Sequence, residues 1–160
     1  MISRTKKEEL PELVAIYNHY VRNTTVTFNT EEVDEEQFLA AFYADENKYS
    51  LHTVYKDSRI IGYCSLNPFN KKEAYRRSAY VSIYLDPSFT GKGLGKEVLE
   101  FLEQKAVEME YRSLIALISR ENTTSCSFFN KNGYHEVGEL KQAGEKFGRL
   151  LDVVYYQKLI

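Results

Sequence analysis

A glycine-rich segment in the second half of the chain has the residue types and spacing of an anion site. Gly91, Gly93 and Gly95 stand at alternate positions, with Lys92 and Lys96 beside them. Glycines let the backbone curl so that successive N–H groups converge on one point, and the N-terminus of a following helix adds partial positive charge there. A flexible loop with a glycine cap would need one glycine, not three. The segment therefore predicts that its backbone binds an anion.

Two common phosphate-binding motifs do not fit this segment. The P-loop pattern, GxxxxGK followed by S or T, would need a glycine where Thr90 stands and a hydroxyl residue where Glu97 stands. The dinucleotide pattern GxGxxG, started at Gly91, meets Lys96 at its third glycine. The motif alone therefore leaves the identity of the anion open.

The composition is that of one ordinary globular domain. The chain has 160 residues, of which 43% are hydrophobic and 28% charged, and its formal net charge is -2. This length suits a single domain over residues 1–160. The near-neutral charge predicts that neither nucleic acid nor a membrane is a partner. The longest uninterrupted apolar run, residues 114–118, is far shorter than the ~20 residues that span a bilayer.

Neither a secretory signal nor a metal site is indicated. Residues 1–10 are charged and lack the apolar centre of a signal peptide, which favours a cytoplasmic location. The three histidines lie far apart, and the two cysteines, Cys64 and Cys126, lack CxxC spacing. We therefore expect two buried free thiols and no bound metal.

Hydrophobic periodicity predicts the elements that position the glycine-rich segment. Alternating apolar residues mark a strand at 78–85 before it, and apolar residues at helical spacing mark a long helix at 94–109 after it. A capping box at Thr5 and Glu8 opens the first helix, which ends near residue 20, and a second box opens a short helix at Asp34. The other expected elements are strands at 2–4, 50–56, 59–66, 113–118, 134–140 and 150–158, and a short helix at 122–132. This order predicts an α/β (α+β) domain, with four helices around one mixed, twisted sheet of about six to seven strands.

The glycine-rich segment resembles the signature of the GNAT superfamily of N-acetyltransferases, Q/R-x-x-G-x-G/A, with Thr90 at the first position. In that family the segment lies between the fourth strand and the third helix, where main-chain N–H groups bind the pyrophosphate of acetyl-CoA. Because the backbone makes this contact, Thr90 in place of Gln or Arg is compatible with the role. The resemblance implies a GNAT-like acyltransferase fold and an acetyl-CoA-dependent N-acetyltransferase.

Three further stretches resemble the phosphinothricin acetyltransferase subgroup of that superfamily. They are residues 16–31, Ala74 with Tyr75, and residues 143–148. The subgroup acetylates the α-amino group of glutamate-like or methionine-derived amino acids and is commonly homodimeric. The resemblance thus implies a small-molecule amine as the partner, acetyl-CoA as the co-substrate and a homodimer.

The resemblance also places the family's cofactor contacts on particular positions. The strand backbone at Ile83, Tyr84 and Leu85 would face the acetyl and pantetheine part of acetyl-CoA. One main-chain N–H there would polarise the thioester carbonyl, a contact worth roughly 3 to 4 kcal/mol. Asn122 and Ser125, at the start of the fourth helix, would bind the pantetheine arm, and Asn122 also fits a plain helix cap. The pyrophosphate would contact Gly91, Lys92, Gly93, Leu94, Gly95 and Lys96.

Both proton-transfer positions of the subgroup differ in this chain. The glutamate that acts as general base aligns with Tyr80, and the residue that reprotonates the thiolate aligns with Phe129. A tyrosine with an ordinary pKa of ~10 is protonated at neutral pH and cannot accept the proton of the amine. Three readings follow: an enzyme that works by positioning while water carries the proton, an enzyme in which another residue substitutes, or an acyl-CoA-binding sensor or scaffold without catalysis. The active enzyme is the expected case.

Candidate residues for catalysis and substrate binding follow from these positions. The groups that could move a proton are the catalytic candidates Tyr80 and Tyr84 and, behind them, Glu73, Tyr75, His19 and His135. The substrate-binding candidates are Phe28, Tyr75 and Arg77, with Arg76 and Lys146 as further partners for a carboxylate. Solvated surface charge or core packing is the alternative explanation for each. Cys126 has no basic neighbour in the sequence, so we expect it to pack rather than to form an acyl-cysteine.

Overall fold

The computed structural model describes residues 1–42 and 50–160. Its strands are β1 Ile2–Arg4, β2 Ser50–Lys56, β3 Arg59–Pro68, β4 Ser78–Leu85, β5 Ser113–Ser119, β6 His135–Lys146 and β7 Arg149–Leu159. Its α-helices are α1 Leu10–Asn23, α2 Glu35–Ala40, α3 Leu94–Glu108 and α4 Thr123–Lys131, and short 3-10 turns lie at Lys7–Glu9, Glu73–Tyr75 and Pro87–Phe89. The order of the elements is the one that the periodicity predicts.

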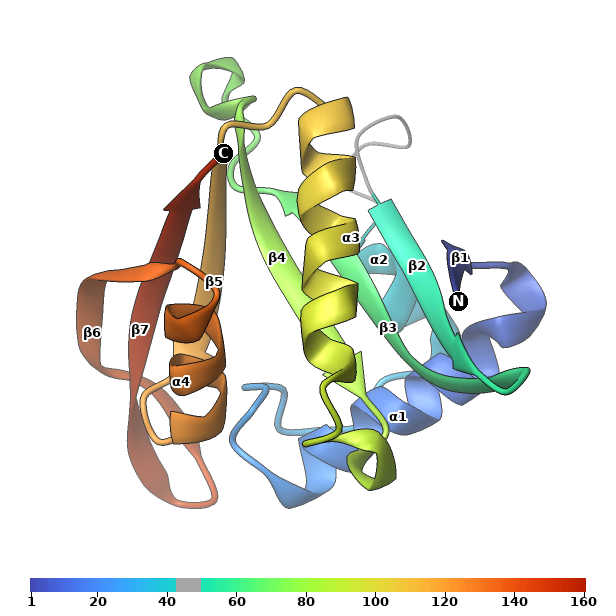
Figure 1. Cartoon of the computed structure of the whole chain (residues 1–160). Helices are drawn as coiled ribbons and strands as arrows, with labels where there is room; N and C mark the ends of the chain where they lie inside the picture. The colour runs from blue at the N-terminus through green and yellow to red at the C-terminus, as the bar shows by residue number, and fades with distance from the viewer. Residues whose placement is uncertain (43–49) are drawn as a thin grey trace.

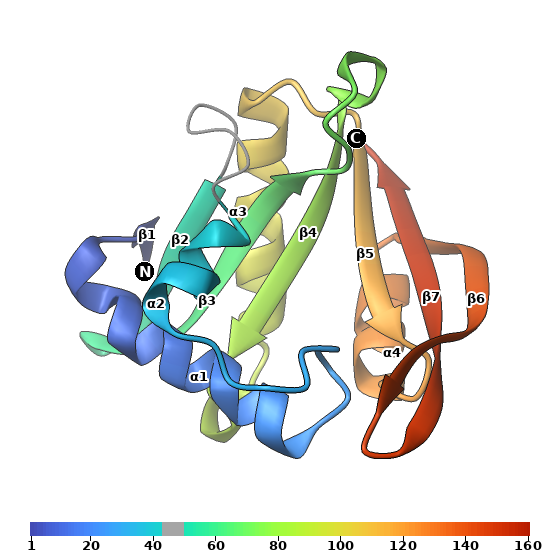
Figure 2. The ribbon, with the colours of Figure 1, turned by 180° about the vertical axis from the view of Figure 1, so that it is seen from behind.

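The described strands form one seven-stranded sheet in the order β1-β2-β3-β4-β5-β7-β6. Neighbouring strands are antiparallel, except that β4 and β5 run parallel. Helices α3 and α4 lie on one face of the sheet (Figure 1), and α1 and α2 lie on the other. Figure 2 shows α1 and α2 across β2, β3 and β4, and the described helices leave the same face of β5, β7 and β6 uncovered. The expected mixed sheet with four helices is confirmed.

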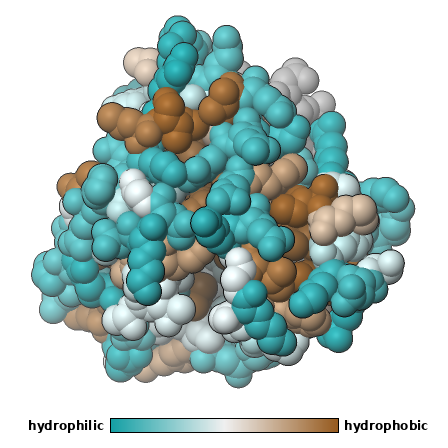
Figure 3. All heavy atoms as spheres, in the orientation of Figure 1, coloured by the Kyte–Doolittle hydropathy of each residue, from teal (hydrophilic) through white to brown (hydrophobic). Residues whose placement is uncertain are grey.

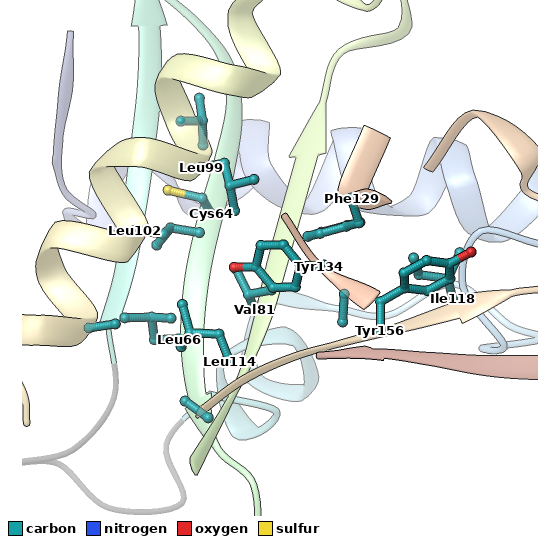
Figure 4. Close-up of a cluster of buried hydrophobic side chains, with 14 of the residues drawn as sticks. Cys64, Leu66, Val81, Leu99, Leu102, Leu114, Ile118, Phe129, Tyr134 and Tyr156 are labelled. Carbon is teal, nitrogen blue, oxygen red and sulfur yellow. The ribbon is translucent and has the colours of Figure 1, made fainter. Parts of the chain in front are cut away.

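The main core fills the space between the sheet and the helices α3 and α4. Alternation along β4 turns Ala79, Val81 and Leu85 to this side, where they join a cluster with Leu99 and Leu102 of α3. Figure 4 shows the same cluster continuing through aromatic side chains beside α4. The intervening residues of β4 therefore face the side of α1 and α2.

The outer side of α3 is polar, as expected for a helix that covers a core with one face. Its buried residues are Val98, Leu99, Leu102 and Ala106, and Figure 3 shows mainly hydrophilic side chains on the face turned to solvent. None of the described helices is long and apolar enough to cross a bilayer.

The start of the first helix differs from the prediction. A 3-10 turn comes first, and Glu9 rather than Glu8 makes the capping contact by accepting a hydrogen bond from the N–H of Lys6 at 2.9 Å. The predicted box at Thr5 and Glu8 is therefore wrong by one residue. The helix also runs on to Asn23 instead of ending near residue 20.

The closing hairpin is longer than the sequence predicts. Strand β6 continues to Lys146 and β7 begins at Arg149, so residues 141–146 are strand rather than loop. Phe147 and Gly148 form the connection with φ values of 52° and 68°, as two-residue hairpin turns require. Strand β6 is the edge of the sheet and mostly exposed, so its polar residues and Gly144 give no hydrophobic alternation.

The two cysteines are both free, as expected. Cys64 is fully buried in the main core, and burial raises the pKa of its thiol to about 12. Cys126 on α4 is only partly buried. The expectation of two buried thiols is therefore correct for Cys64 and wrong for Cys126.

Candidate functional site

The parallel strands β4 and β5 separate partway along their length. Their pairing covers Ser78, Ala79 and Tyr80 of β4, and beyond this point the strands diverge, as both ribbon views show (Figure 1; Figure 2). A cavity of about 320 Å³ occupies the gap. Its walls come from β3, β4, β5, β7 and the segment that follows α1. We refer to it as the first cavity.

The register of β4 shows which backbone groups border this gap. The C=O of Ser78 accepts a hydrogen bond from β3 through the N–H of Phe69 at 3.0 Å. Backbone groups alternate in direction along an antiparallel strand, so the even-numbered residues of β4 bond to β3. Val81 and Ile83 therefore direct their N–H and C=O groups toward the side of β5. The N–H of Val81 still belongs to the last pairing step with Ile115, so the groups past the end of the pairing are the C=O of Val81 and both groups of Ile83.

The three residues predicted to present strand backbone differ in what they offer. Ile83 directs its N–H and C=O to the gap. The C=O of Leu85 accepts a hydrogen bond from the hydroxyl of Tyr20 at 2.5 Å. Tyr84 pairs with Tyr63 of β3, so its backbone faces β3 and its side chain is what reaches the cavity.

The glycine-rich segment follows the end of β4 and leads into α3. Gly91 and Gly93 have φ values of +73° and +82°, a conformation that glycine adopts without a steric penalty. A Cβ atom on either would meet nothing within 4 Å, whereas one on Gly95 would lie 3.2 Å from the ring of Phe128. At the start of α3 the N–H of Lys96 donates to the C=O of Gly93 at 3.1 Å, whereas the N–H groups of Leu94 and Gly95 have no carbonyl partner inside the helix. The loop thus presents unpaired N–H groups to open space, as an anion site requires.

Two lysines add positive charge beside this loop. Lys92 donates to the C=O of Ser88 at 2.8 Å, and its ammonium lies 5.1 Å from the ring centre of Phe89. Lys96 is exposed and pairs with Glu100 at 3.7 Å. Both side chains are close to the segment, and their contact with an anion stays a prediction.

A second cavity of about 210 Å³ lies on the side of α1 and α2. It shares Asn67, Ser82 and Tyr84 with the first cavity, so the two spaces meet at these residues. Half of its remaining lining is aromatic, namely Tyr17, Phe38, Phe42 and Tyr63. No Asp, Glu, Lys, Arg or His lines either cavity in the described part of the chain.

The two tyrosines predicted as catalytic candidates both line the first cavity. Burial raises the pKa of Tyr84 well above its ordinary value, and the neighbouring Tyr17 raises it further. The pKa of Tyr80 is also raised, by burial and then by Tyr155. Both hydroxyls therefore keep their protons at neutral pH, so they can donate a hydrogen bond or a proton but do not act as bases.

The segment after α1, which forms one wall of the first cavity, is held by the β6–β7 hairpin. Lys146 is 3% exposed, and its ammonium donates to the C=O of Thr27 at 2.8 Å. The hydroxyl of Thr25 donates to Glu121 at 2.6 Å, and Arg149 donates to the same carboxylate at 3.0 Å. The guanidinium of Arg149 holds the pKa of Glu121 below its ordinary value. Lys146, predicted as a partner for a substrate carboxylate, thus holds the cavity wall instead.

The start of α4 shows the helix cap that the sequence allows. The side chain of Asn122 accepts from the N–H of Ser125 at 3.1 Å, and its amide donates to the Ser125 hydroxyl at 2.8 Å. Contact of either residue with the cofactor stays a prediction. Phe129 is 7% exposed and packs on Tyr134 with ring centres 5.0 Å apart, so this position offers no proton.

Two of the predicted substrate-binding residues lie away from both cavities. Tyr75 sits in the 3-10 turn before β4 and reaches Tyr80 only through Phe69, with ring centres 5.4 Å and then 5.2 Å apart. Arg77 follows the same turn and is exposed. The structure brings Phe28, Tyr80 and Tyr84 together, and it leaves Tyr75 and Arg77 outside.

The other groups considered for proton transfer are also outside the cavities. Glu73 is exposed and lies 3.8 Å from Arg76. His135 is exposed, and the ring of His19 contacts Tyr20 with centres 5.6 Å apart. The geometry therefore places no substitute base in the described lining of either cavity.

Two polar residues in the first cavity were missed by the sequence analysis. They are Asn67 of β3 and Ser119 of β5. The Oδ1 atom of Asn67 and the Oγ atom of Ser119 are buried, and none of the described residues forms a hydrogen bond with them. Both lie at the ends of apolar strand patterns, just beyond the predicted strand limits at residues 66 and 118. This polarity at a strand end is the one signal that could have identified them.

Comparison with known proteins agrees with this geometry. Residues 13–134 match the Acetyltransferase (GNAT) family. A phosphinothricin N-acetyltransferase from Streptomyces coelicolor is 30% identical, with the match covering 95% of this chain and 91% of that protein. An L-methionine sulfoximine/L-methionine sulfone acetyltransferase from Pseudomonas paraeruginosa is 32% identical, with the match covering 93% of this chain and 88% of that protein.

The fold is shared with a solved structure that contains acetyl-CoA. This is the crystal structure of a GNAT superfamily phosphinothricin acetyltransferase from Sinorhizobium meliloti in complex with AcCoA. The two structures superpose with a TM-score of 0.93 at 28% identity, covering 100% of this chain and 88% of that one.

Proposed function

The chain belongs to the GNAT family and is an acetyltransferase, and we propose that it transfers the acetyl group of acetyl-CoA to the primary amine of a small amino acid or amino acid analogue. One observation carries the proposal. The gap beside the open edge of β4 meets a second, aromatic cavity at Asn67, Ser82 and Tyr84. An acyl donor lying along β4 and an amine in the second cavity would come together there.

The residues present fit acetyl-CoA, which supplies the acetyl group as a thioester. The C=O of Val81 and the N–H and C=O of Ile83, beyond the end of the β4–β5 pairing, can bind an extended pantetheine arm as a further strand would be bound. The N–H groups around Gly91 and Gly93 can bind the pyrophosphate at the start of α3. The acetyl-CoA complex of the similar structure from Sinorhizobium meliloti supports this assignment.

The lining of the second cavity favours an acceptor with an uncharged side chain. The described residues around it are aromatic, aliphatic or neutral polar. An anionic group placed there would lose its hydration without gaining a cationic partner, which is costly. We therefore favour methionine sulfoximine or methionine sulfone, the substrates in the name of one relative, over the anionic phosphinothricin named for another.

The protonation state of the site defines the mechanism. No base lines the described cavities, so the acceptor amine must lose its proton to water before it attacks the thioester carbonyl. As the new C–N bond forms, an N–H group of β4 polarises the carbonyl oxygen. As the C–S bond breaks, the hydroxyl of Tyr84, which burial keeps neutral by raising its pKa, can donate a hydrogen bond to the departing thiolate, and the thiolate takes its proton from water.

Binding of acyl-CoA without catalysis is the second candidate function. It is favoured by the occupants of the two proton-transfer positions, since Tyr80 holds its proton and Phe129 has none to give. General acid–base catalysis is worth about 10² to 10⁴ in rate, so its loss slows a transferase without stopping it.

Release of free thiol from acetyl-CoA tests the proposal. The purified protein is assayed with methionine sulfoximine, methionine sulfone, phosphinothricin, other amino acids and polyamines. We expect release with the two methionine derivatives, at a higher kcat/KM than with phosphinothricin. Calorimetric binding of acetyl-CoA without release by any amine would support the binding protein instead. Absence of both would contradict the cofactor assignment.

The subgroup resemblance supports a homodimer. Sedimentation equilibrium tests this part of the proposal independently of activity. A single species of twice the chain mass of 18.6 kDa is expected, and a species of the chain mass would contradict it.

A further inference from the structure

Asn67 stands where the two cavities meet, and we infer that its side-chain oxygen binds the acceptor amine and orients it toward the thioester. This inference rests on the proposed acetyltransferase function. Asn67 lies near the end of β3 and pairs across the sheet with Tyr80. Cross-strand partners share a face of the sheet, so both side chains lie on the α1 and α2 side. Asn67 is thus next to the position where the subgroup resemblance expects the base.

The environment of Asn67 indicates a missing partner. Its Oδ1 atom is buried, and none of the described residues donates a hydrogen bond to it. A buried acceptor without a donor destabilises a folded protein and is rare in native structures. Asn67 itself lines both cavities, so a ligand that reaches Oδ1 would supply the missing donor. An amine or ammonium N–H is such a donor.

The position of Asn67 indicates which ligand atom donates the hydrogen bond to Oδ1. With Ser82 and Tyr84 it forms the boundary shared by the two cavities. The acyl donor occupies the first cavity in the proposed arrangement, and the acceptor side chain occupies the second. The atom that must cross from one to the other is the attacking nitrogen, so Asn67 faces the reacting amine rather than a distant part of the substrate.

The chemistry of a carboxamide limits the role to binding and orientation. Its oxygen accepts a hydrogen bond, and it does not take up a proton at neutral pH. Holding one N–H of the amine directs the nitrogen lone pair away from Asn67 and toward the acyl donor. Asn67 therefore places a hydrogen-bond acceptor near the position where the subgroup has a carboxylate. Unlike that carboxylate, it does not act as a base.

The first test compares Asn67→Leu with Ser65→Ala. Leucine keeps the branching and the number of side-chain heavy atoms of asparagine and removes the acceptor. Ser65 is a matched control because it lies on the same strand and face, and its buried Oγ atom also has no partner, yet it lines neither cavity. Both substitutions remove an unsatisfied buried group, so neither variant should melt at a lower temperature than the wild type.

Steady-state kinetics with methionine sulfone separate the two variants. Asn67→Leu is expected to raise the KM of the amine and lower kcat/KM at least tenfold, while the dissociation constant of acetyl-CoA stays unchanged. Ser65→Ala is expected to match the wild type in the KM of the amine, in kcat/KM and in the dissociation constant of acetyl-CoA. An unchanged kcat/KM in a folded Asn67→Leu variant, or an equal loss in Ser65→Ala, would overturn the inference.

Asn67→Asp distinguishes an acceptor from a donor at this position. If Oδ1 accepts from the amine, aspartate keeps that contact, and the amine KM stays below that of Asn67→Leu. Its carboxylate would also flatten the rise of kcat/KM with pH by acting as a base. If the asparagine amide instead donated to a substrate carboxylate, the aspartate would repel the substrate and raise the KM above that of Asn67→Leu. That result would overturn the inference.

The wild-type protein separates failure of this inference from failure of the proposed function. Thiol release by the wild type together with an unaffected Asn67→Leu variant contradicts the role of Asn67 alone. Absence of release by the wild type with every amine contradicts the transferase function, and the role of Asn67 as an amine ligand falls with it.

Discussion

The ring of Phe28 lies directly on the backbone of Gly144. A Cβ atom at Gly144 would overlap two carbons of this ring. Phe28 lines the first cavity from the segment after α1, and Gly144 lies on β6. Because Gly144 has no side chain, the ring of Phe28 can lie against β6. This contact positions a wall of the first cavity that is far from β6 in the sequence.

Substitution of Gly144 by alanine should weaken acetyl-CoA binding. The added methyl group must displace the ring of Phe28, and overpacking of this kind costs about 1 to 3 kcal/mol. Since 1.4 kcal/mol is about tenfold in an equilibrium constant, we expect the KM of acetyl-CoA to rise about tenfold. Gly138→Ala is the control, because a Cβ on this other glycine of β6 would meet nothing within 4 Å. Equal KM values for the two variants would show that Phe28 does not shape the site.

Replacement of Lys146 by methionine should loosen the same wall and change the pH dependence of stability. The variant loses the hydrogen bond to the C=O of Thr27, so we expect a higher KM for acetyl-CoA. Burial lowers the pKa of Lys146 from 10.5, so the unfolded chain holds this proton to higher pH than the folded chain does. The contribution of Lys146 to the free energy of unfolding therefore rises with pH toward 10.5.

Urea unfolding of the wild type and of Lys146→Met at several alkaline pH values checks this sign. The wild type should gain stability relative to the variant as pH rises. Lys141→Met is the control on the same strand, since Lys141 is exposed and its ion pairs with Glu139 and Asp152 are of a kind worth about 0 to 1 kcal/mol. A relative loss of stability with rising pH would contradict the burial of the Lys146 charge.

Substitution of Gly93 by valine should weaken acetyl-CoA binding. A side chain at a φ of +82° strains the loop, by roughly 1 to 2 kcal/mol, and it would project into the space proposed for the pyrophosphate. We expect calorimetry to give a dissociation constant raised about tenfold or more. Gly148→Val introduces similar strain at a φ of +68° in the β6–β7 turn and should leave the dissociation constant unchanged. A similar loss in both variants would argue against the loop as the pyrophosphate site.

Removal of the two tyrosine hydroxyls should have unequal effects. Tyr84→Phe removes the proposed hydrogen-bond donor to the thiolate and should lower kcat by about 10²-fold, as the loss of one preorganised donor does. Tyr80→Phe should leave kcat within about threefold of the wild type, because a hydroxyl with a raised pKa is not a base at neutral pH. Thiol release under saturating substrates measures both. A large loss of kcat in Tyr80→Phe alone would assign the catalytic hydroxyl to Tyr80 instead of Tyr84.

Local patterns in the sequence predicted the strands that carry the site. Alternation over eight residues gave both limits of β4 correctly, because one face of this strand packs in the core and the pattern has a period of two. The capping box of α2 was also correct, since Asp34 accepts from the N–H of Gln37 at 2.8 Å. Such features depend on residues that are close in the sequence, so a short stretch of sequence is enough to predict them.

The divergence of β4 from β5 was not predictable in the same way. It depends on how α3 and α4 separately cover the two halves of the sheet, which no local pattern records. The contacts that Asn67, Gly144 and Lys146 make also join segments far apart in the chain. The resemblance to the GNAT family located the glycine-rich segment and the two altered proton-transfer positions, but it did not place Lys146 or Asn67.

The pH dependence of kcat/KM with methionine sulfone tests most directly the central claim, that this site transfers an acetyl group without a base. Without a base in the protein, log kcat/KM should rise by about one per pH unit through the neutral range until the amine of the substrate is itself deprotonated. The Tyr80→Phe variant should give the same curve. A profile that levels off near neutral pH, well below the pKa of the amine, would show that a group of the protein accepts the proton and would contradict the account.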